Sequence, residues 1–252
     1  MSHFEAILFD MDGVLVDVST SYRRVIEETA THFMGQPVEP GTVQRYKNLG
    51  GYNDDWALTH AIIQAQGVNV PLSRVIAEFQ RRYRGDQWDG LISSEKPIIS
   101  MRCLQLLKKQ YRVMGVVTGR PEAEARWTIA HFGWQSFFPL IVAKEQQDTR
   151  PKPDPYPLTR ALGTLRAAQL SIRPDQAVYI GDTVDDMKAA RAAGLWALGF
   201  APSYLDDVTA HTQLLRDHGA HETLTDMRKL PEVLQHWSFG AEDEQDPETA
   251  TP

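Results

Sequence analysis

Side chains that could perform nucleophilic, acid–base or metal chemistry recur at the ends of short apolar segments in this sequence. They are two carboxylates, a hydroxyl, an ammonium group and two more carboxylates, in the order Asp10, Asp12, Thr118, Lys152, Asp182 and Asp186. Carboxylate oxygens are hard ligands that suit Mg²⁺. If Asp10, Asp182 and Asp186 are ionised and close together, their repulsion requires a compensating cation. Mg²⁺ together with Lys152 would balance the three charges, so we expect a magnesium site that can accept a phosphate group.

The segments before these groups have the length and composition of strands that are buried on both faces of a sheet. They cover residues 6–9, 113–117, 140–142 and 177–180, with 195–200 as a fifth. Helical patterns lie between them, and this alternation favours an open α/β sheet with right-handed crossovers. Ligands bind at the carboxyl ends of the strands in such a sheet, so we expect the polar side chains to converge on one crevice.

One region interrupts the alternation of strands and helices. Between residues 19 and 92 two apolar stripes with helical spacing occur, one beginning at Tyr22 and the other at Leu72, and no strand is indicated. We therefore predict a small helical domain inserted after the first strand. The predicted organisation is an α/β core at residues 1–18 and 93–237, a helical cap at 19–92, and a disordered acidic tail at 238–252.

Composition and charge exclude several classes of protein. The 252 residues carry a net charge of −7, and five of the acids lie in the last 14 residues. The rest has 26 basic and 28 acidic side chains, a balance that gives no reason to expect binding to nucleic acid or an anionic membrane. The chain has one cysteine, no apolar run long enough to cross a bilayer and no secretory signal at its start. We expect a cytoplasmic monomer or dimer.

The four groups of polar residues closely resemble the motifs of the haloacid dehalogenase-like hydrolase superfamily. Residues 6–17 are similar to its first motif, Thr118 to the second, Lys152 to the third, and residues 181–186 to the fourth. The resemblance extends to about Phe200. It implies a Rossmann-like parallel sheet, and the helical insertion resembles the branch of helical-cap enzymes that contains phosphoglycolate phosphatase, β-phosphoglucomutase and phosphonatase.

The resemblance implies a role for each residue of the first two motifs. Asp10 would be the nucleophile that attacks phosphorus and forms an aspartyl-phosphate. Asp12 would protonate the leaving alcohol and then deprotonate the attacking water, and two positions along a strand its side chain points the same way as that of Asp10. Thr118 and the backbone N–H of Gly119 would donate hydrogen bonds to phosphoryl oxygens.

The resemblance also implies how charge is balanced in the site. Lys152 would offset the negative charge of the nucleophile and the phosphoryl group. Asp10, the backbone carbonyl of Asp12 and Asp182 would hold Mg²⁺. Asp186 would support these ligands without contacting the metal, and Asp185 is expected to be solvated or to cap a helix.

Substrate selection is expected to come from the cap, because the core residues are generic. The candidate segment covers residues 45–56, in which Lys47 and Asn53 could contact a second group of the substrate. Its Gly50–Gly51 pair has two equally weighted explanations, which are close approach to a ligand and a turn between helices with Asn53 or Asp54 as the N-cap. Arg120 has the same two possibilities, a substrate contact or a structural role.

These observations favour a magnesium-dependent phosphatase that acts on a small phosphorylated metabolite. A phosphomutase of the β-phosphoglucomutase type would use the same Asp10 and Asp12 and is the main alternative. A dehalogenase would leave Asp12 without a task, and a phosphonatase would need a cap lysine such as Lys47. A phosphoacceptor domain for signalling is disfavoured, because its acidic pair and acceptor lie on different strands.

Overall fold

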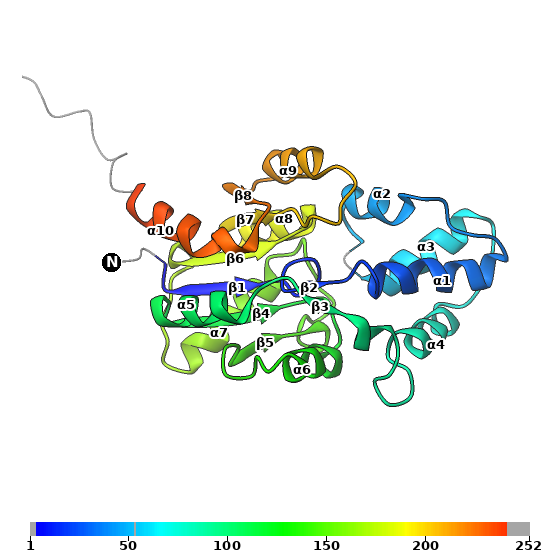
Figure 1. Cartoon of the computed structure of the whole chain (residues 1–252), viewed down its shortest axis with the longest axis horizontal. Helices are drawn as coiled ribbons and strands as arrows, with labels where there is room; N and C mark the ends of the chain where they lie inside the picture. The colour runs from blue at the N-terminus through cyan, green and yellow to red at the C-terminus, as the bar shows by residue number, and fades with distance from the viewer. Residues whose placement is uncertain (1–3, 53, 241–252) are drawn as a thin grey trace, which may run out of the picture.

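The computed structural model describes residues 4–52 and 54–240, and its centre is a six-stranded sheet in the order β5-β4-β1-β6-β7-β8. All neighbouring strands run parallel. The strands are β1 (Ala6–Phe9), β4 (Val113–Val117), β5 (Leu140–Val142), β6 (Ala177–Gly181), β7 (Trp196–Phe200) and β8 (Glu222–Leu224). This arrangement confirms the predicted open α/β sheet (Figure 1).

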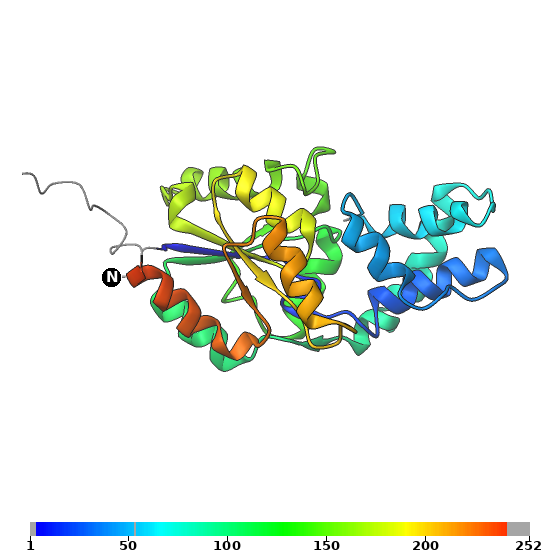
Figure 2. The same cartoon turned by 90° about the horizontal axis from the view of Figure 1, so that it is seen from above.

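Helices cover both faces of the sheet, which explains why the strands are apolar at nearly every position. Along β1, Ile7 and Phe9 pack into one apolar cluster, whereas Ala6 and Leu8 pack into the other. The first cluster includes residues of α5 (Met101–Gln110), α6 (Glu122–His131) and α10 (Leu230–Gly240). The second includes residues of α7 (Tyr156–Ala167), α8 (Val184–Ala192) and α9 (Val208–Asp217). Figure 2 shows α7 and α8 on one side of the sheet and α5 and α10 on the other.

A separate group of helices lies beyond the end of the sheet at which β1 terminates (Figures 1 and 2). It consists of α1 (Tyr22–Met34), α2 (Thr42–Leu49), α3 (Asp55–Ala65) and α4 (Leu72–Tyr83), followed by the short 3₁₀ helix η1 (Leu91–Ser94). Its centre is apolar, since Val25 and Ile26 of α1, Ile63 of α3 and Phe79 of α4 are buried. We call this helical segment, residues 19–92, the cap.

The two chain segments that connect the cap to the sheet lie next to each other. The strand β2 (Val16–Asp17) pairs antiparallel with β3 (Lys96–Pro97). The connection is completed by a hydrogen bond from Ile98 N to Leu15 O at 2.9 Å. Both connections therefore enter the cap at one place, which is the geometry of a hinge.

The predicted strands are confirmed, but three short ones were not expected. Strands β2, β3 and β8 have only two or three residues, with the sequences VD, KP and ETL, so none is the continuous apolar run that marks the other strands. Helix α10 continues to Gly240, so the predicted tail began three residues too early, and residues 241–252 lie outside the described part of the chain. Among the described helices, none is both long enough and apolar enough to span a bilayer.

Candidate active site

The polar residues predicted to converge do so at the carboxyl ends of the strands. Strand β1 lies between β4 and β6, so Asp10 has Thr118 on one side and Asp182 on the other. A pocket opens there between the core and the cap. Its lining includes Asp10, Asp12, Gly119, Arg120 and Asp182 from the core and Arg23, Lys47, Asp54, Asp55 and Trp56 from the cap.

Lys152 forms the centre of a buried ionic cluster. Its Nζ lies 3.1 Å from Asp10 Oδ1 and 2.6 Å from Asp186 Oδ1, and it donates a hydrogen bond to Tyr179 Oη at 2.8 Å. Burial opposes its charge, but Asp10 and Asp186 outweigh that effect and raise the pKa of Lys152. The ammonium group is therefore permanently charged next to Asp10.

Asp186 is saturated with hydrogen-bond donors. Besides Lys152, its carboxylate accepts hydrogen bonds from Thr183 Oγ1 at 2.6 Å and from the backbone N–H groups of Thr183 at 3.0 Å and Asp182 at 3.2 Å. Burial would raise its pKa, but Lys152 and these donors lower it below its usual range. Asp186 therefore fixes Lys152 and the start of α8, while its expected role of supporting the metal ligands without contacting the metal stays a prediction.

Asp10 and Asp182 are less well compensated, although Lys152 Nζ lies 3.1 Å from Asp10 Oδ1. Burial raises the pKa of Asp10 to about 7 and, together with Asp186 and Asp10, raises that of Asp182 well above its usual range. No donor among the described residues reaches Asp10 Oδ1 with hydrogen-bond geometry. One oxygen each from Asp10, Asp182 and Asp186 lies within 4.8 Å of the others. An Asp10 oxygen that accepts no hydrogen bond and the hard donor set fit a divalent cation such as Mg²⁺.

Gly13 allows the chain to turn beside Asp182. Its φ is +73°, a left-handed conformation that side chains other than glycine rarely adopt. A Cβ at this position would lie 2.1 Å from Asp182 Oδ2, so the carboxylate occupies the space that a side chain would fill. The glycine of the first motif thus brings the loop after β1 against the acid after β6.

Thr118 and Gly119 lie at the end of β4. The Thr118 backbone is fixed on both sides, because its N–H donates to Val142 O at 2.9 Å and its carbonyl accepts from Gln147 Nε2 at 2.7 Å. Its buried hydroxyl accepts a hydrogen bond from the backbone N–H of Arg120 at 3.2 Å. Gly119 lines the pocket, and the predicted hydrogen bond from its N–H to a phosphoryl oxygen stays a prediction.

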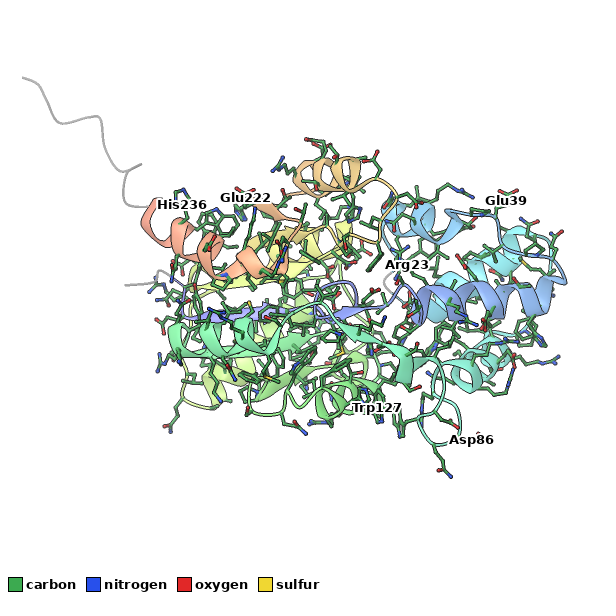
Figure 3. All side chains as sticks on the ribbon, viewed as in Figure 1. Arg23, Glu39, Asp86, Trp127, Glu222 and His236 are labelled. Carbon is green, nitrogen blue, oxygen red and sulfur yellow. The ribbon has the colours of Figure 1, made fainter. Side chains whose placement is uncertain are left out.

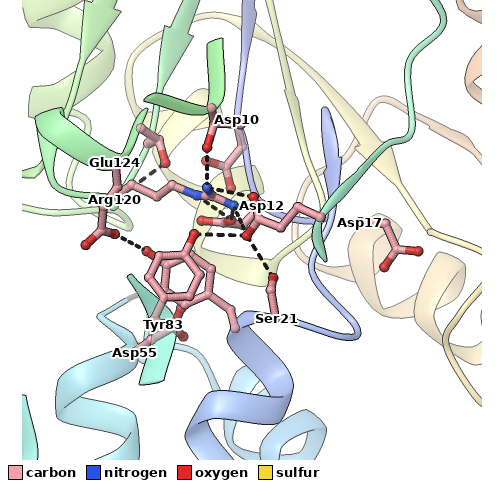
Figure 4. Close-up of polar contacts among 12 residues, drawn as sticks. Asp10, Asp12, Asp17, Ser21, Asp55, Tyr83, Arg120 and Glu124 are labelled. Carbon is pink, nitrogen blue, oxygen red and sulfur yellow. Dashed lines mark hydrogen bonds and ion pairs between the residues drawn. The ribbon is translucent and has the colours of Figure 1, made fainter. Parts of the chain in front are cut away.

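Arg120 and Asp12 form an ion pair with a separation of 2.5 Å between Nη2 and Oδ1 (Figure 4). The Arg120 side chain has no exposed surface, whereas a quarter of the Asp12 side chain is exposed. Its guanidinium also contacts Glu95 and Thr128. The structure thus places Arg120 against protein groups at the back of the pocket, and its predicted contact with substrate stays a prediction.

The candidate substrate residues of the cap are partly engaged with each other and with the core. Lys47 pairs with Asp55 at 2.5 Å. Asp54 caps α3 by accepting from Trp56 N at 3.0 Å, and it also pairs with Lys144 of the core. The explanation of a turn with an N-cap therefore applies with Asp54, while Asn53 lies outside the described residues.

The Gly50–Gly51 pair approaches the core at Asp185. The Gly51 N–H donates a hydrogen bond to Asp185 Oδ2 at 2.8 Å, and a Cβ on Gly50 would lie 2.9 Å from Asp185 Oδ1. Asp185 is only 3% exposed, and Thr183 is the N-cap of α8. The expectation of a solvated or capping residue was wrong, because the cap covers this carboxylate and binds it.

Two pocket residues had no signal in the sequence. Arg23 lies on the first cap helix at the boundary with the core, with its guanidinium 5.3 Å from the centre of the Tyr204 ring (Figure 3). His211 Nε2 donates to the backbone carbonyl of Asp182 at 2.7 Å. Each stands alone in the sequence, outside any motif, and only the approach of α1 and α9 to the strand ends brings them into the pocket.

Comparisons with known proteins agree with this geometry. Residues 7–200 match the profile of a family described as haloacid dehalogenase-like hydrolase. The chain is 35% identical over 238 residues to an imidazoleglycerol-phosphate dehydratase of Phytophthora nicotianae, covering 89% of this chain and 51% of that protein. It thus spans about half the length of this relative. It is 29% identical over 191 residues to a phosphoglycolate phosphatase of Xylella fastidiosa, covering 75% of this chain and 76% of the other.

A solved structure shares the fold. The crystal structure of a predicted phosphoglycolate phosphatase from Haemophilus somnus matches with a TM-score of 0.73 and 19% identity, over 93% of this chain and 100% of the other. The family profile covers well over half of the sequence and includes all four groups of polar residues. The chain is therefore an enzyme that belongs to the haloacid dehalogenase-like hydrolase family.

Proposed function

We propose that the protein is a magnesium-dependent phosphatase that hydrolyses a small phosphorylated metabolite through an aspartyl-phosphate. The observation that carries this proposal is the pair Asp10 and Asp182, whose pKa values stay raised even with Lys152 next to Asp10, at the carboxyl ends of adjacent strands. Such a group of charges is unfavourable alone but becomes complementary to a divalent cation with a phosphate.

The side chains divide the reaction between them. The Asp10 carboxylate attacks phosphorus, the bond from phosphorus to the ester oxygen breaks, and the leaving alcohol takes a proton from Asp12. Water then attacks the aspartyl-phosphate, Asp12 takes its proton, and inorganic phosphate leaves. Throughout, Lys152 balances charge on Asp10 and the phosphoryl group. Mg²⁺, when bound by Asp10, Asp182 and the backbone carbonyl of Asp12, would neutralise charge on the phosphoryl oxygens.

The shape of the pocket supports a small substrate. Its walls come from both the core and the cap, so a bound molecule would be enclosed by both. A covered site excludes bulk water and strengthens the electrostatic interactions within it. A folded phosphoprotein would not enter such a space without displacing the cap.

The test is phosphate release from a panel of phosphate esters, measured with Mg²⁺ and with EDTA. The wild type and Asp10→Asn are compared on phosphoglycolate, sugar phosphates and nucleotides. Release that needs Mg²⁺ and is lost in Asp10→Asn supports the proposal. Transfer of phosphate to a second hydroxyl of the substrate, with no inorganic phosphate, would contradict it in favour of a mutase.

A narrower substrate class follows from the Phytophthora nicotianae relative. Its name describes an enzyme that acts on imidazoleglycerol phosphate, and this chain matches about half of it. We infer that phosphate esters with an imidazole ring are candidate substrates. The pocket wall includes the Trp56 ring and the carboxylates of Asp54 and Asp55. A substrate ring that displaced Lys144, whose Nζ lies 4.3 Å from the centre of the Trp56 ring and pairs with Asp54, would stack on Trp56.

The imidazole class can be tested separately. L-Histidinol phosphate is a suitable probe, because it joins an imidazole ring to a simple alkyl phosphate ester. A value of kcat/KM at least about tenfold above that for phosphoglycolate supports the class, since a few correct polar contacts discriminate by this amount or more. Equal or lower values would exclude it while leaving the phosphatase proposal intact.

A further inference from the structure

A buried ion-pair network lies behind Asp12, at the junction of the core with the cap. Both Nε and Nη2 of Arg120 donate hydrogen bonds to Asp12 Oδ1, at 2.7 and 2.5 Å. The opposite edge of the guanidinium contacts Glu95 in a two-pronged pair, with Nη1 to Oε2 and Nη2 to Oε1 both at 3.1 Å. A further hydrogen bond from Nη1 to Thr128 Oγ1 measures 2.9 Å. Figure 4 shows Arg120 reaching across to Asp12 beside the Tyr83 ring.

Cap residues complete this network. The Arg120 guanidinium lies 4.8 Å from the ring centre of Tyr22 and 5.9 Å from that of Tyr83, the first and last residues of the helices α1 and α4 respectively. Glu95, which follows η1 on the hinge, accepts hydrogen bonds from Ser21 Oγ at 2.8 Å and Tyr83 Oη at 2.9 Å. Apart from Thr128 on α6 of the core, the groups around Arg120 therefore come from the cap and the hinge, and Arg120 in turn fixes the carboxylate that follows β1.

The contacts on Asp12 distinguish its two oxygens. Both donors of Arg120 converge on Oδ1, so that oxygen has its acceptor positions directed at the guanidinium. A proton on Asp12 must then reside on Oδ2. The positive charge of Arg120 is already balanced by Glu95, so Arg120 can orient the Asp12 carboxyl group without imposing an unpaired charge on it.

A network that only stabilised the fold would not need these charges. Buried ion pairs cost desolvation, and apolar side chains of similar volume often serve stability as well or better. A role for Asp12, which lies at the exposed end of the network, better explains why this desolvation cost is tolerated. The Asp12 side chain is 25% exposed and lines the pocket, whereas the Arg120 side chain has no exposed surface.

We propose that Arg120 is a positioning residue, which, anchored by Glu95, fixes the Asp12 carboxyl group through Oδ1 so that Oδ2 exchanges the proton with the leaving alcohol. This inference rests on the proposed phosphatase function. Because Tyr22 and Tyr83 belong to the cap, the alignment of Asp12 depends on the position of the cap. Closure over a substrate and alignment of the acid are then linked through one side chain.

The test compares two esters that differ in their need for a proton on the leaving group. An alkyl phosphate such as phosphoglycolate needs protonation of its alcohol, whereas p-nitrophenyl phosphate releases a stable phenolate. Since general acid catalysis contributes about 10²–10⁴-fold, Arg120→Met should lower kcat/KM for the alkyl ester by about 10²-fold or more and for the aryl ester by less than about tenfold. Glu95→Gln, which keeps the shape of the side chain, should show the same selectivity with a smaller loss.

Two further variants separate positioning from a structural role. Arg120→Lys keeps the charge but has a single nitrogen, so it should restore only part of the alkyl-ester activity. In an Asp12→Asn background, Arg120→Met should cause no additional selective loss, because the group that it positions is gone. Arg82→Met is the matched control, since Arg82 is a half-buried cap arginine paired with Glu28 and Glu78, and it should leave the ratio between the esters unchanged.

The outcomes distinguish this inference from the proposed function. Equal losses on both esters, or a selective loss that persists in the Asp12→Asn background, would overturn the positioning role alone. If Arg120→Met does not fold, the selectivity of Glu95→Gln and Arg120→Lys decides in the same way. Failure of the wild type to hydrolyse either ester would overturn the phosphatase proposal and this inference with it.

Discussion

Replacing Asp10 by asparagine should stabilise the protein in the absence of a metal. Burial raises the pKa of Asp10 from 3.8 to about 7, with Lys152 opposing the rise and Asp186 and Asp12 adding to it. A carboxyl group with a raised pKa in the folded state reduces stability when it is ionised, because the unfolded chain does not bear the same cost. A difference of about 3 in pKa corresponds to about 4 kcal/mol.

The pH dependence of this effect has a definite sign. The cost is absent below the unfolded pKa of 3.8, grows as the pH rises, and is complete above the folded pKa of about 7. Asparagine carries no charge at any pH. The free energy of unfolding of Asp10→Asn should therefore exceed that of the wild type by an amount that rises from near zero at about pH 4 to the order of 4 kcal/mol at about pH 8.

Urea unfolding in EDTA across this pH range measures the difference directly. Adding Mg²⁺ at 1,000 times its Kd should remove it, because the ligand then stabilises the wild type by about 4.1 kcal/mol and the variant has lost a metal ligand. Asp86→Asn is the control, because Asp86 is an exposed residue on the loop after α4, away from the cluster (Figure 3). The reasoning is refuted by a variant that is no more stable than the wild type at about pH 8 in EDTA, or by equal stabilisation of both by Mg²⁺.

Three other substitutions test separate parts of the site. Gly13→Ala should lower the free energy of unfolding by more than about 1 kcal/mol, because the φ of this residue is +73°. It should also abolish magnesium-dependent turnover, because the new Cβ would collide with Asp182. Thermal unfolding measures the loss of stability, and phosphate release measures the loss of turnover. Asp185→Ala removes the hydrogen bond to Gly51 N, so native-state trypsin cleavage of the cap should accelerate about fivefold, the equivalent of about 1 kcal/mol, and an unchanged rate would contradict the role of this contact. If Lys47 binds a second anionic group of the substrate, Lys47→Met should raise KM about tenfold or more with little change in kcat. If Lys47 only supports the cap, steady-state kinetics should show a loss in kcat alone.

Three residues of the site could be predicted to converge because the sequence places each of them directly after a strand. Asp10 follows β1, Thr118 follows β4 and Asp182 follows β6, and the topology of parallel sheets brings these ends together. Only local information was needed, namely the apolar run and the residue that ends it. The same reasoning located five of the six strands of the sheet to within one residue of their ends.

Contacts between the cap and the core could not be predicted in this way. Arg120 and Glu95 are 25 residues apart, and Gly51 and Asp185 are 134 apart. Neither pair belongs to a periodic pattern, and each exists only because the hinge sets the cap at one angle to the sheet. Glu95 in particular has no neighbouring residue that marks it, since it is an acid in a polar segment whose burial follows from the position of α1 and α4.

The position of β1 at the centre of the sheet determines when the site can form during synthesis. Ala6 pairs with Val113 of β4 on one side and with Ala177 of β6 on the other, so β1 cannot complete its pairing until β6 has been synthesised. The cap has no such requirement, because α1, α3 and α4 contact one another within residues 22–83. Contacts between distant parts of a sequence form slowly, whereas helical contacts form early. On a ribosome the cap can therefore fold while Asp10 still lacks its β6 neighbour, and a truncated chain that ends before Ala177 would contain a folded cap with no assembled site.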